Sequence, residues 1–283
     1  MVAVPTPSDD AWVERAAKAI DKADALLVCA GAGMGVDSGL PDFRGNEGFW
    51  NAYPPYRDLG VSFMSMANPA WFRRDPQFAW GFYGHRRNLY RETKPHPGFA
   101  ILERWGRAMP GGYFVFTSNV DAQFQRAGFA GDQILECHGS IEHSQCMDYC
   151  GAGIVEADDA NLTIDVATMK AAAPLPACPQ CGSLARPNIL MFGDADWEGD
   201  RCQRQVGRMN QWFRERSGER IVIVECGAGT GVPTVRLNAE SYIDGPDSLI
   251  RLNPREPEVP HGQLGVPIGA LAGLERIDAR RDG

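Results

Sequence analysis

The sequence predicts an α/β fold built on a Rossmann-like parallel sheet, and three observations support this prediction. The segments Ala25–Cys29 and Ile221–Cys226 read as strands, and the apolar run Ala25–Val28 in the first of them is expected for a strand buried on both faces of a parallel sheet. A glycine-rich stretch follows each segment, at Gly31–Gly33 and at Gly227–Gly231, and such loops let the backbone turn sharply and approach a ligand. Segments with helical spacing lie between the expected strands, which is the alternation of a doubly wound domain.

Composition narrows the class of protein. The chain has 283 residues, 44% of them hydrophobic, and a formal net charge of −8, which is typical of a globular protein. No apolar run approaches the roughly 20 residues of a membrane span, and Met1–Asp10 lacks the charged and apolar regions of a signal peptide. The acidic charge argues against nucleic-acid binding, which needs a basic surface. We therefore expect a cytoplasmic protein with neither a membrane nor a nucleic-acid partner.

The remaining elements of the main domain follow from apolar spacing and turn residues. Asp9 or Asp10 can cap a first helix that runs through Trp12–Ile20. Arg186–Asp194 is expected to return the chain to the main sheet. The pattern predicts further helices at Gly98–Arg107, Arg201–Arg216 and Val266–Leu274, and further strands at Tyr113–Phe116, at Gln133–Gly139 and, as the last strand, at Leu249–Leu252.

Two segments interrupt this alternation and predict a smaller lobe. Residues 46–97 are rich in aromatic residues, Pro and Asn, and we interpret them as a helical insertion. Residues 141–186 contain paired cysteines and form a second insertion, within which Gly151–Pro176 is expected to be a surface excursion. The main domain would then consist of residues 1–45, 98–140 and 187–283.

Four cysteines in the second insertion have the spacing of a zinc site. Cys146 and Cys150 form one pair, and Cys178 and Cys181 form a second pair of the zinc-ribbon kind. The alternative, two disulfides, is disfavoured in a cytoplasmic protein. Because four thiolates complete a tetrahedron, the sequence predicts a structural Zn²⁺ with no open position for catalysis.

The first glycine loop leads into a more specific motif. The run Gly31-Ala32-Gly33 is followed by Ser38-Gly39 and then by Pro41-Asp42-Phe43-Arg44-Gly45. This arrangement resembles the opening motif of the sirtuins, the NAD-dependent protein-lysine deacylases, in their bacterial type. The resemblance implies that Gly31, Ala32 and Gly33 contact NAD. It also implies that Asp42 and Arg44 order the loop on NAD, and that Phe43 covers the emptied nicotinamide pocket.

A second block, Thr117–Asp121, lies at the end of a predicted strand. It resembles the sirtuin segment T-Q-N-[IV]-D, with Ser118 in place of the usual glutamine. The resemblance implies that Ser118, Asn119 and Asp121 bind the nicotinamide end of NAD, with Asn119 also part of the catalytic centre. From the residues alone, Asn119 or Asp121 can equally cap the helix that follows, and both interpretations can hold.

His138 is the candidate general base. It stands before Gly139 at an expected strand end, and histidine is suited to proton transfer near neutral pH. It matches the catalytic histidine of the sirtuins, and His143 is its one rival among the other histidines. The resemblance further implies that the second glycine loop, through Gly227, Ala228, Gly229 and Thr230, and Asn253 after the last strand, contact NAD phosphate and ribose.

Substrate contacts are expected from two segments. Met191, Phe192 and Gly193 match the sirtuin segment that holds the substrate peptide as an added strand, although the residues alone also fit a plain buried strand. Tyr83 and Arg86 share one helical face, which from spacing alone indicates an aromatic core contact beside a solvated arginine. The pair also resembles the Tyr-x-x-Arg motif of sirtuins that remove succinyl and malonyl groups.

The resemblance implies an enzyme that removes acyl groups from protein lysine, consuming NAD and releasing nicotinamide and O-acyl-ADP-ribose. Acylated protein lysines would be its partners, and NAD and structural Zn²⁺ its cofactors. Two other functions stay open at this point. One is NAD glycohydrolysis or ADP-ribosyl transfer on the same fold, and the other is a non-catalytic NAD or ADP-ribose sensor.

Overall fold

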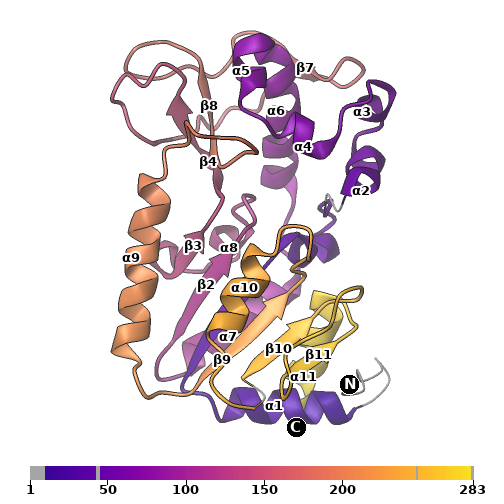
Figure 1. The fold of residues 1–283 in the computed structure, drawn as a ribbon, viewed down its shortest axis with the longest axis vertical. Coiled ribbons are helices and arrows are strands. Elements are labelled where there is room, and N and C mark those ends of the chain that lie inside the picture. Colours follow the sequence, from indigo (N-terminus) through magenta and orange to yellow (C-terminus); the bar gives the residue numbers. More distant parts are fainter. Residues whose placement is uncertain (1–9, 43–44, 247, 282–283) are drawn as a thin grey trace.

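The main domain is a parallel sheet, seen in the lower half of Figure 1. The computed structural model describes residues 10–42, 45–246 and 248–281. Within these ranges a six-stranded sheet has the order β11-β10-β9-β1-β2-β3, and every neighbouring pair is parallel. The predicted Rossmann-like parallel sheet is therefore confirmed. Its strands are β1 (Ala25–Ala30), β2 (Tyr113–Thr117), β3 (Ile134–Glu136), β9 (Ile221–Cys226), β10 (Leu249–Leu252) and β11 (Leu264–Val266).

Helices cover both faces of this sheet because successive residues of its central strand point to opposite sides. Leu26 and Val28 of β1 belong to the core under one set of helices, and Leu27 and Cys29 belong to the core under the other. The first core includes residues of α1 (Ala11–Asp21), α7 (Pro97–Ala108) and α11 (Ala270–Arg281), and the second includes residues of α9 (Asp200–Glu215) and α10 (Thr234–Ser241).

The smaller lobe lies above the sheet in Figure 1 and surrounds the long helix α6 (Pro76–Glu92). Its second part is an antiparallel sheet of order β5-β4-β8. The strands of this sheet are β4 (Gly139–Cys146), β5 (Val155–Glu156) and β8 (Ala185–Ile189). The lobe also contains the helices α2 (Gly45–Ala52), α3 (Pro54–Asp58), α4 (Phe63–Met66) and α5 (Ala70–Arg74) and the strands β6 (Ile164–Asp165) and β7 (Lys170–Ala171). Three short helices lie next to strands of the main sheet: η1 (Ala32–Ser38) follows β1, α8 (Gln123–Arg126) follows β2, and η2 (Gly131–Gln133) precedes β3.

The predicted surface excursion at Gly151–Pro176 is wrong in part, because its β6–β7 hairpin packs on α6. A Cβ atom on Gly81 would lie 1.9 Å from the carbonyl oxygen of Met169, so only glycine permits this approach. Met169 and Ala171 are buried with the aromatic residues of α6. The hairpin is thus part of the core of the small lobe.

Three sequence predictions about the main sheet are corrected by the structure. Arg186–Asp194 does not return to it: β8 pairs antiparallel with β4 in the small-lobe sheet. The strand before His138 ends earlier, at Glu136, and His138 lies in a turn. Val266 ends the additional strand β11, and the last helix, α11, begins only at Ala270.

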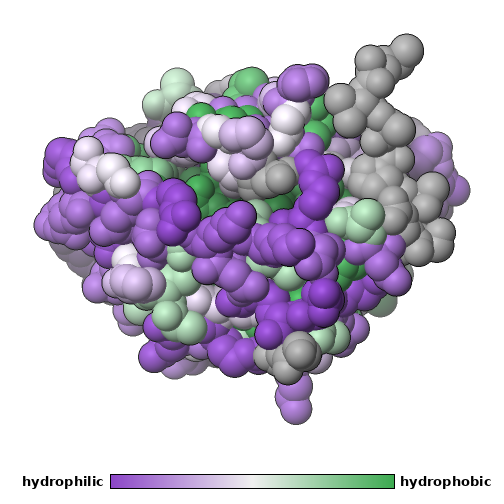
Figure 2. All heavy atoms as spheres, turned by 90° about the horizontal axis from the view of Figure 1, so that it is seen from below, coloured by the Kyte–Doolittle hydropathy of each residue, from purple (hydrophilic) through white to green (hydrophobic). Residues whose placement is uncertain are grey.

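The end of the molecule that carries α1 and α11 is largely hydrophilic (Figure 2). Asp10 precedes α1 as predicted, but its side chain makes no capping hydrogen bond. Its carboxylate instead pairs with Arg276 of α11 at 2.7 Å, and Asp21 pairs with Arg281 at 2.7 Å. Exposed pairs of this kind contribute little free energy each, so the two helices are held mainly by the apolar core. Among the helices in the described ranges, none has the length and apolar character that a bilayer crossing requires.

Candidate active site

A cavity of about 710 Å³ lies between the carboxyl edge of the parallel sheet and the small lobe. This is the place where open α/β sheets bind ligands, because the loops that follow adjacent strands diverge there. The cavity is lined by most of the site residues that the sequence predicted. These are Gly31, Ala32, Asp42, Tyr83, Arg86, Ser118, Asn119, Asp121, His138, Met191, Phe192, Gly227, Ala228, Gly229 and Thr230.

Three of the predicted cofactor and substrate residues in the described ranges are not brought to this cavity. Gly33, Gly193 and Asn253 lie outside its lining. Phe43 and Arg44 fall outside the described residues, so their expected roles on the NAD loop remain predictions.

The two glycine loops interlock, which explains their glycines better than phosphate contacts do. The amide of Gly31 donates to the carbonyl of Cys226 at 3.0 Å, and the amide of Gly33 donates to the carbonyl of Gly227 at 3.0 Å. A Cβ atom on Gly33 would lie 2.7 Å from the Cα atom of Gly227, which itself has φ +65°. These two amides therefore join the loops and are not offered to a ligand.

Asn253 supports the second loop from behind and does not reach the cavity. Its side chain is fully buried, and its amide donates to the carbonyl of Ala228 at 2.8 Å. Its side-chain oxygen accepts from the amides of Arg255 and Glu256, each at 3.1 Å. These contacts give no support to the predicted ribose contact, because the polar atoms of Asn253 are engaged within the protein.

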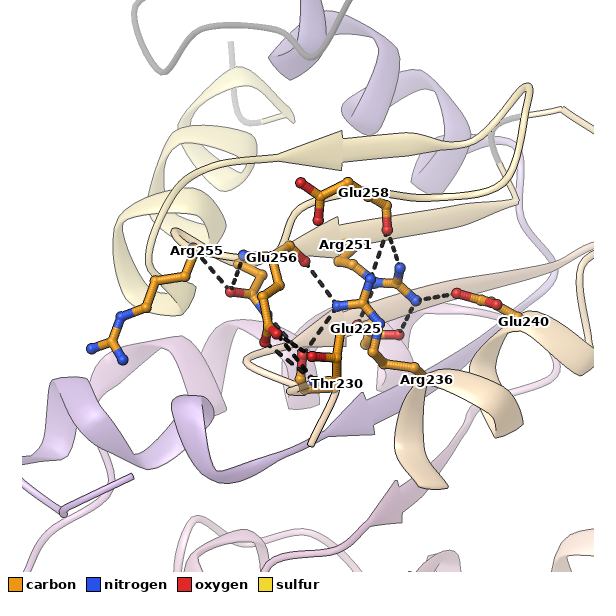
Figure 3. A network of polar contacts seen from close by, with 10 residues as sticks. Glu225, Thr230, Arg236, Glu240, Arg251, Arg255, Glu256 and Glu258 are labelled. Atoms are coloured by element: carbon orange, nitrogen blue, oxygen red, sulfur yellow. Dashed lines mark hydrogen bonds and ion pairs between the residues drawn. The ribbon is translucent and has the colours of Figure 1, made fainter. Parts of the chain in front are cut away.

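Glu256 is a cavity residue that the sequence prediction missed. It lines the cavity, and its carboxylate accepts hydrogen bonds from the amide of Thr230 at 3.3 Å and from the Thr230 hydroxyl (Figure 3). A carboxylate just after a strand of such a sheet is suited to ribose hydroxyls. The signal was present, because Glu256 follows the predicted strand end by four residues.

Buried arginines hold this wall of the cavity in place (Figure 3). Arg251 of β10 pairs with Glu225 of β9 through two contacts, of 2.5 and 2.8 Å, and both side chains are fully buried. Arg236 of α10 donates to the carbonyls of Glu256 at 2.9 Å and Glu258 at 2.8 Å. The loop after β10 is thereby fixed against α10 and the second glycine loop.

His138 lies in the turn between β3 and β4 and lines the cavity, as predicted. The next residue must be glycine: Gly139 has φ +78°, and a Cβ atom there would lie 2.0 Å from the carbonyl oxygen of Asn188. The carbonyl of His138 accepts from the amide of Leu190 at 2.9 Å, which fixes the turn. Burial lowers the pKa of His138, and a hydrogen bond with the Ser118 backbone opposes this shift. His138 is therefore held toward the neutral form that a general base needs.

Asn119 and Asp121 follow β2 and line the cavity beside His138. The Asn119 side chain donates to the carbonyl of Gly31 at 3.0 Å, which ties β2 to the first glycine loop. Asp121 accepts from the amide of Gln123 at 3.0 Å, so the interpretation as a helix cap also holds. Burial raises the pKa of Asp121 to about 6, and the charge of Glu136 adds to the shift.

Tyr83 and Arg86 are buried side chains of the cavity wall, with exposed fractions of 1% and 7%. The expectation of a solvated arginine, drawn from spacing alone, is therefore wrong. Arg86 is bonded to a phenol, but to that of Tyr90: its Nε and Nη2 atoms donate to the Tyr90 hydroxyl at 2.9 and 2.7 Å. Tyr90 also lines the cavity and was missed by the sequence prediction.

The segment with Met191, Phe192 and Gly193 is shaped by a buried ion pair. Arg186 and Asp194 pair through two contacts, of 2.8 and 2.9 Å. Asp194 also accepts from the amide of Met191 at 3.2 Å, and the amide of Phe192 donates to the carbonyl of Ala67 at 2.9 Å. Gly193, with φ +68°, makes the turn that this geometry requires.

Cys146, Cys150, Cys178 and Cys181 converge in space, with all four sulfur atoms within 4.8 Å of one another. The sulfurs of Cys146 and Cys181 are 3.6 Å apart, and those of Cys150 and Cys178 are 3.5 Å apart. A disulfide needs about 2.05 Å, whereas a tetrahedron with Zn–S bonds of about 2.3 Å has edges of about 3.8 Å. The cluster fits zinc, as the sequence predicted.

His143 points to a test of stability against pH. It lies on β4 outside the cavity, so it is not the base, and its Nδ1 atom is buried without a hydrogen-bond partner in the described chain. Burial, together with the charge of Arg201, lowers the pKa of His143 to about 4. Below pH ~6.5 the unfolded chain binds a proton here that the folded protein refuses until about pH 4. As the pH falls through this window, from about 6.5 to about 4, we expect the free energy of unfolding to decrease. The decrease should be less steep in His143→Gln.

Urea unfolding at several pH values checks this expectation. His261→Gln, which removes an exposed histidine, is the matched control and should follow the parent protein. Parallel curves for His143→Gln and the parent would show that His143 does not contribute.

Comparison with known proteins bears directly on this cavity. A model of the Sir2 family matches residues 31–211, which span the glycine loop, His138 and the four cysteines. The chain belongs to the Sir2 family. It is 30% identical over 269 residues to an NAD-dependent protein deacylase of Thermus thermophilus, covering 93% of this chain and 92% of that protein. It is 34% identical over 188 residues to the mitochondrial NAD-dependent protein deacylase sirtuin-5 of Danio rerio, covering 61% of this chain and 58% of that protein.

Solved Sir2 structures share the fold. A Sir2 homologue in complex with NAD superimposes with a TM-score of 0.71 at 24% identity, covering 99% of this chain and 96% of that one. A mutant Sir2 homologue in complex with ADP-ribose superimposes with a TM-score of 0.68 at 25% identity, covering 95% and 96%. This sirtuin is thus similar to NAD-dependent enzymes along nearly its whole length.

Proposed function

We propose that this sirtuin removes acyl groups from protein lysine in an NAD-dependent reaction that releases nicotinamide and O-acyl-ADP-ribose. The observation that carries the proposal is His138, a half-buried histidine with a lowered pKa, in a cavity walled by both glycine loops. The names of its relatives, NAD-dependent protein deacylases, support the same reaction.

The residues of the cavity divide the work. NAD, when bound, would supply the ribose that loses nicotinamide and whose hydroxyl oxygen receives the acyl group. His138 accepts the proton of a ribose hydroxyl, because its imidazole is neutral near pH 7. Asn119 and Asp121 hold the nicotinamide end, and the wall formed by Ala228, Thr230 and Glu256 holds the adenosine end. The lobes exclude water and hold the reactants in line.

Two further parts of the protein support this reaction. The four cysteines hold a structural Zn²⁺ that joins the end of β4 to the turn at Cys178–Cys181. The segment Met191–Gly193 receives the substrate peptide beside the cavity, where Leu190 is partly exposed.

A panel of acylated lysine peptides, analysed by mass spectrometry in the presence of NAD, tests the proposal. The expected result is free lysine peptide together with nicotinamide and O-acyl-ADP-ribose. Cleavage of NAD at the same rate without peptide would favour a glycohydrolase, and ADP-ribose attached to protein would favour a transferase. Binding of NAD without any turnover would favour a sensor.

The acyl group is proposed to be acidic, such as succinyl or malonyl. Arg86 and Tyr83 line the cavity from α6, and a guanidinium and a phenol can bind a carboxylate at the end of an acyl chain. A carboxylate buried there without a partner would be costly, so the arginine gives acidic chains an advantage.

We expect Arg86→Met to reverse the acyl preference. The methionine keeps the apolar volume but removes the charge, so kcat/KM for succinyl-lysine should fall roughly 10- to 100-fold while that for acetyl-lysine changes less. Steady-state kinetics on two peptides that differ only in the acyl group measure the ratio. An equal ratio in both proteins would mean that Arg86 does not read the acyl chain.

A further inference from the structure

Tyr90 holds one edge of the Arg86 guanidinium. The two residues lie one helical turn apart on α6, and both Nε and Nη2 of Arg86 donate to the single hydroxyl oxygen of Tyr90. The Nε–Nη2 edge is one of the edges through which a guanidinium binds a carboxylate with two parallel hydrogen bonds. The phenol therefore occupies a position that an acyl carboxylate would otherwise take.

The surroundings of this contact make the Tyr90 hydroxyl important for stabilising the buried Arg86 guanidinium. Arg86 and Tyr90 are 7% and 4% exposed. The guanidinium carbon lies 5.2 Å from the ring centre of Phe82 and 5.3 Å from that of Tyr90, so aromatic faces supply much of its environment. A buried cation that loses hydrogen bonds in such surroundings is destabilised more than an exposed one.

The backbone of Tyr90 is held in place, and its hydroxyl is uncharged. Tyr90 lies in the last third of α6, and the side chain of Gln123 donates to its backbone carbonyl at 3.3 Å and to that of Thr93 at 3.2 Å. Burial raises the pKa of Tyr90, so the phenol stays protonated over the physiological range. Tyr90 can thus accept hydrogen bonds from Arg86 without adding a negative charge to the cavity.

We propose that Tyr90 is a neutral internal partner of Arg86 that widens the acyl specificity of this sirtuin. With an acetyl chain in the cavity, Arg86 keeps its two hydrogen bonds to Tyr90. With a succinyl chain, the substrate carboxylate takes over the guanidinium edge and displaces the hydroxyl. The difference between acidic and neutral substrates is therefore smaller than Arg86 alone would produce. This inference rests on the proposed function of the same cavity.

Tyr90→Phe is expected to make the enzyme more selective for acidic acyl groups. Without the hydroxyl, a bound acetyl chain leaves Arg86 short of two hydrogen bonds, whereas a succinyl carboxylate still satisfies it. The ratio of kcat/KM for succinyl-lysine to that for acetyl-lysine should rise roughly 10-fold, because the succinyl carboxylate no longer has to displace the hydroxyl. Loss of stability alone would lower both values and leave the ratio unchanged.

Two further proteins make the test specific. In the Arg86→Met background, adding Tyr90→Phe should leave the ratio as it is in Arg86→Met alone, because the hydroxyl then has no guanidinium to serve. Tyr56→Phe is the matched control: it removes another buried hydroxyl of the same lobe, one without a hydrogen-bond partner in the described chain. Its ratio should equal that of the parent.

The outcomes separate this inference from the function on which it rests. If the parent releases no acyl group from either peptide, the proposed function fails and the role of Tyr90 fails with it. If the parent releases acyl groups but the ratio in Tyr90→Phe is unchanged or lower, the role of Tyr90 alone is overturned. A rise that persists in the Arg86→Met background also overturns it.

Discussion

His138→Ala should lower turnover roughly 10²- to 10⁴-fold, the range for the loss of a general base. The substitution removes the imidazole from the cavity wall but leaves Gly139 and the backbone hydrogen bond to Leu190, so the turn should persist. Binding of NAD should therefore remain close to that of the parent. Single-turnover kinetics and calorimetric titration with NAD measure the two effects separately.

His261→Ala is the matched control for this experiment, because His261 is an exposed residue away from the cavity lining. It should turn over at the parent rate. A parent rate in His138→Ala would reduce His138 to a packing residue and would remove the main support for the proposed chemistry.

Cys178→Ala should lose zinc and much of the stability of the small lobe. Zinc bound to four thiolates contributes free energy to folding directly, so its loss should lower the melting temperature by on the order of 10 °C. Elemental analysis and calorimetry measure the metal content and the transition. The cluster joins β4 to the turn before β8, and those strands pair with each other, so the whole antiparallel sheet should be affected.

Cys202→Ala provides the comparison, since Cys202 is a half-buried cysteine of α9 outside the cluster. This variant should keep one zinc ion per chain and melt close to the parent. A parent protein that is folded and active without bound metal would contradict the assignment of all four cysteines.

The central strands could be predicted because their residues are apolar on both faces. β1 is a continuous apolar run, and β9 is apolar from Ile221 to Val224 before Glu225; this pattern distinguishes a buried parallel strand from an amphipathic element. The same reasoning failed for β8, which was expected in the main sheet but pairs with β4. Its Arg186 and Asn188 are buried only because Asp194 and Gln145 satisfy them, and those partners come together only in the folded chain.

In the candidate site, too, some residues could be predicted from the sequence and others could not. The glycines and His138 could be located from the sequence because each follows a strand that ends at the cavity. Helical spacing placed Tyr83 and Arg86 on one face of α6, but spacing does not reveal whether that face meets solvent or another element. Tyr90 is four residues after Arg86 and has the spacing of an ordinary core aromatic. Its hydrogen bonds to Arg86 depend on the side-chain conformations of both residues.

The contact between Gly33 and Gly227 has a consequence for ligand affinity. Flexible loops lose conformational entropy when a ligand orders them, and that loss is subtracted from the binding free energy. Here the two loops are already joined by backbone hydrogen bonds and by a contact too close for any side chain. Their freedom is lost during folding and not during binding. A dinucleotide that lies along both loops would therefore meet a preorganised surface, and more of its contact energy would appear as affinity.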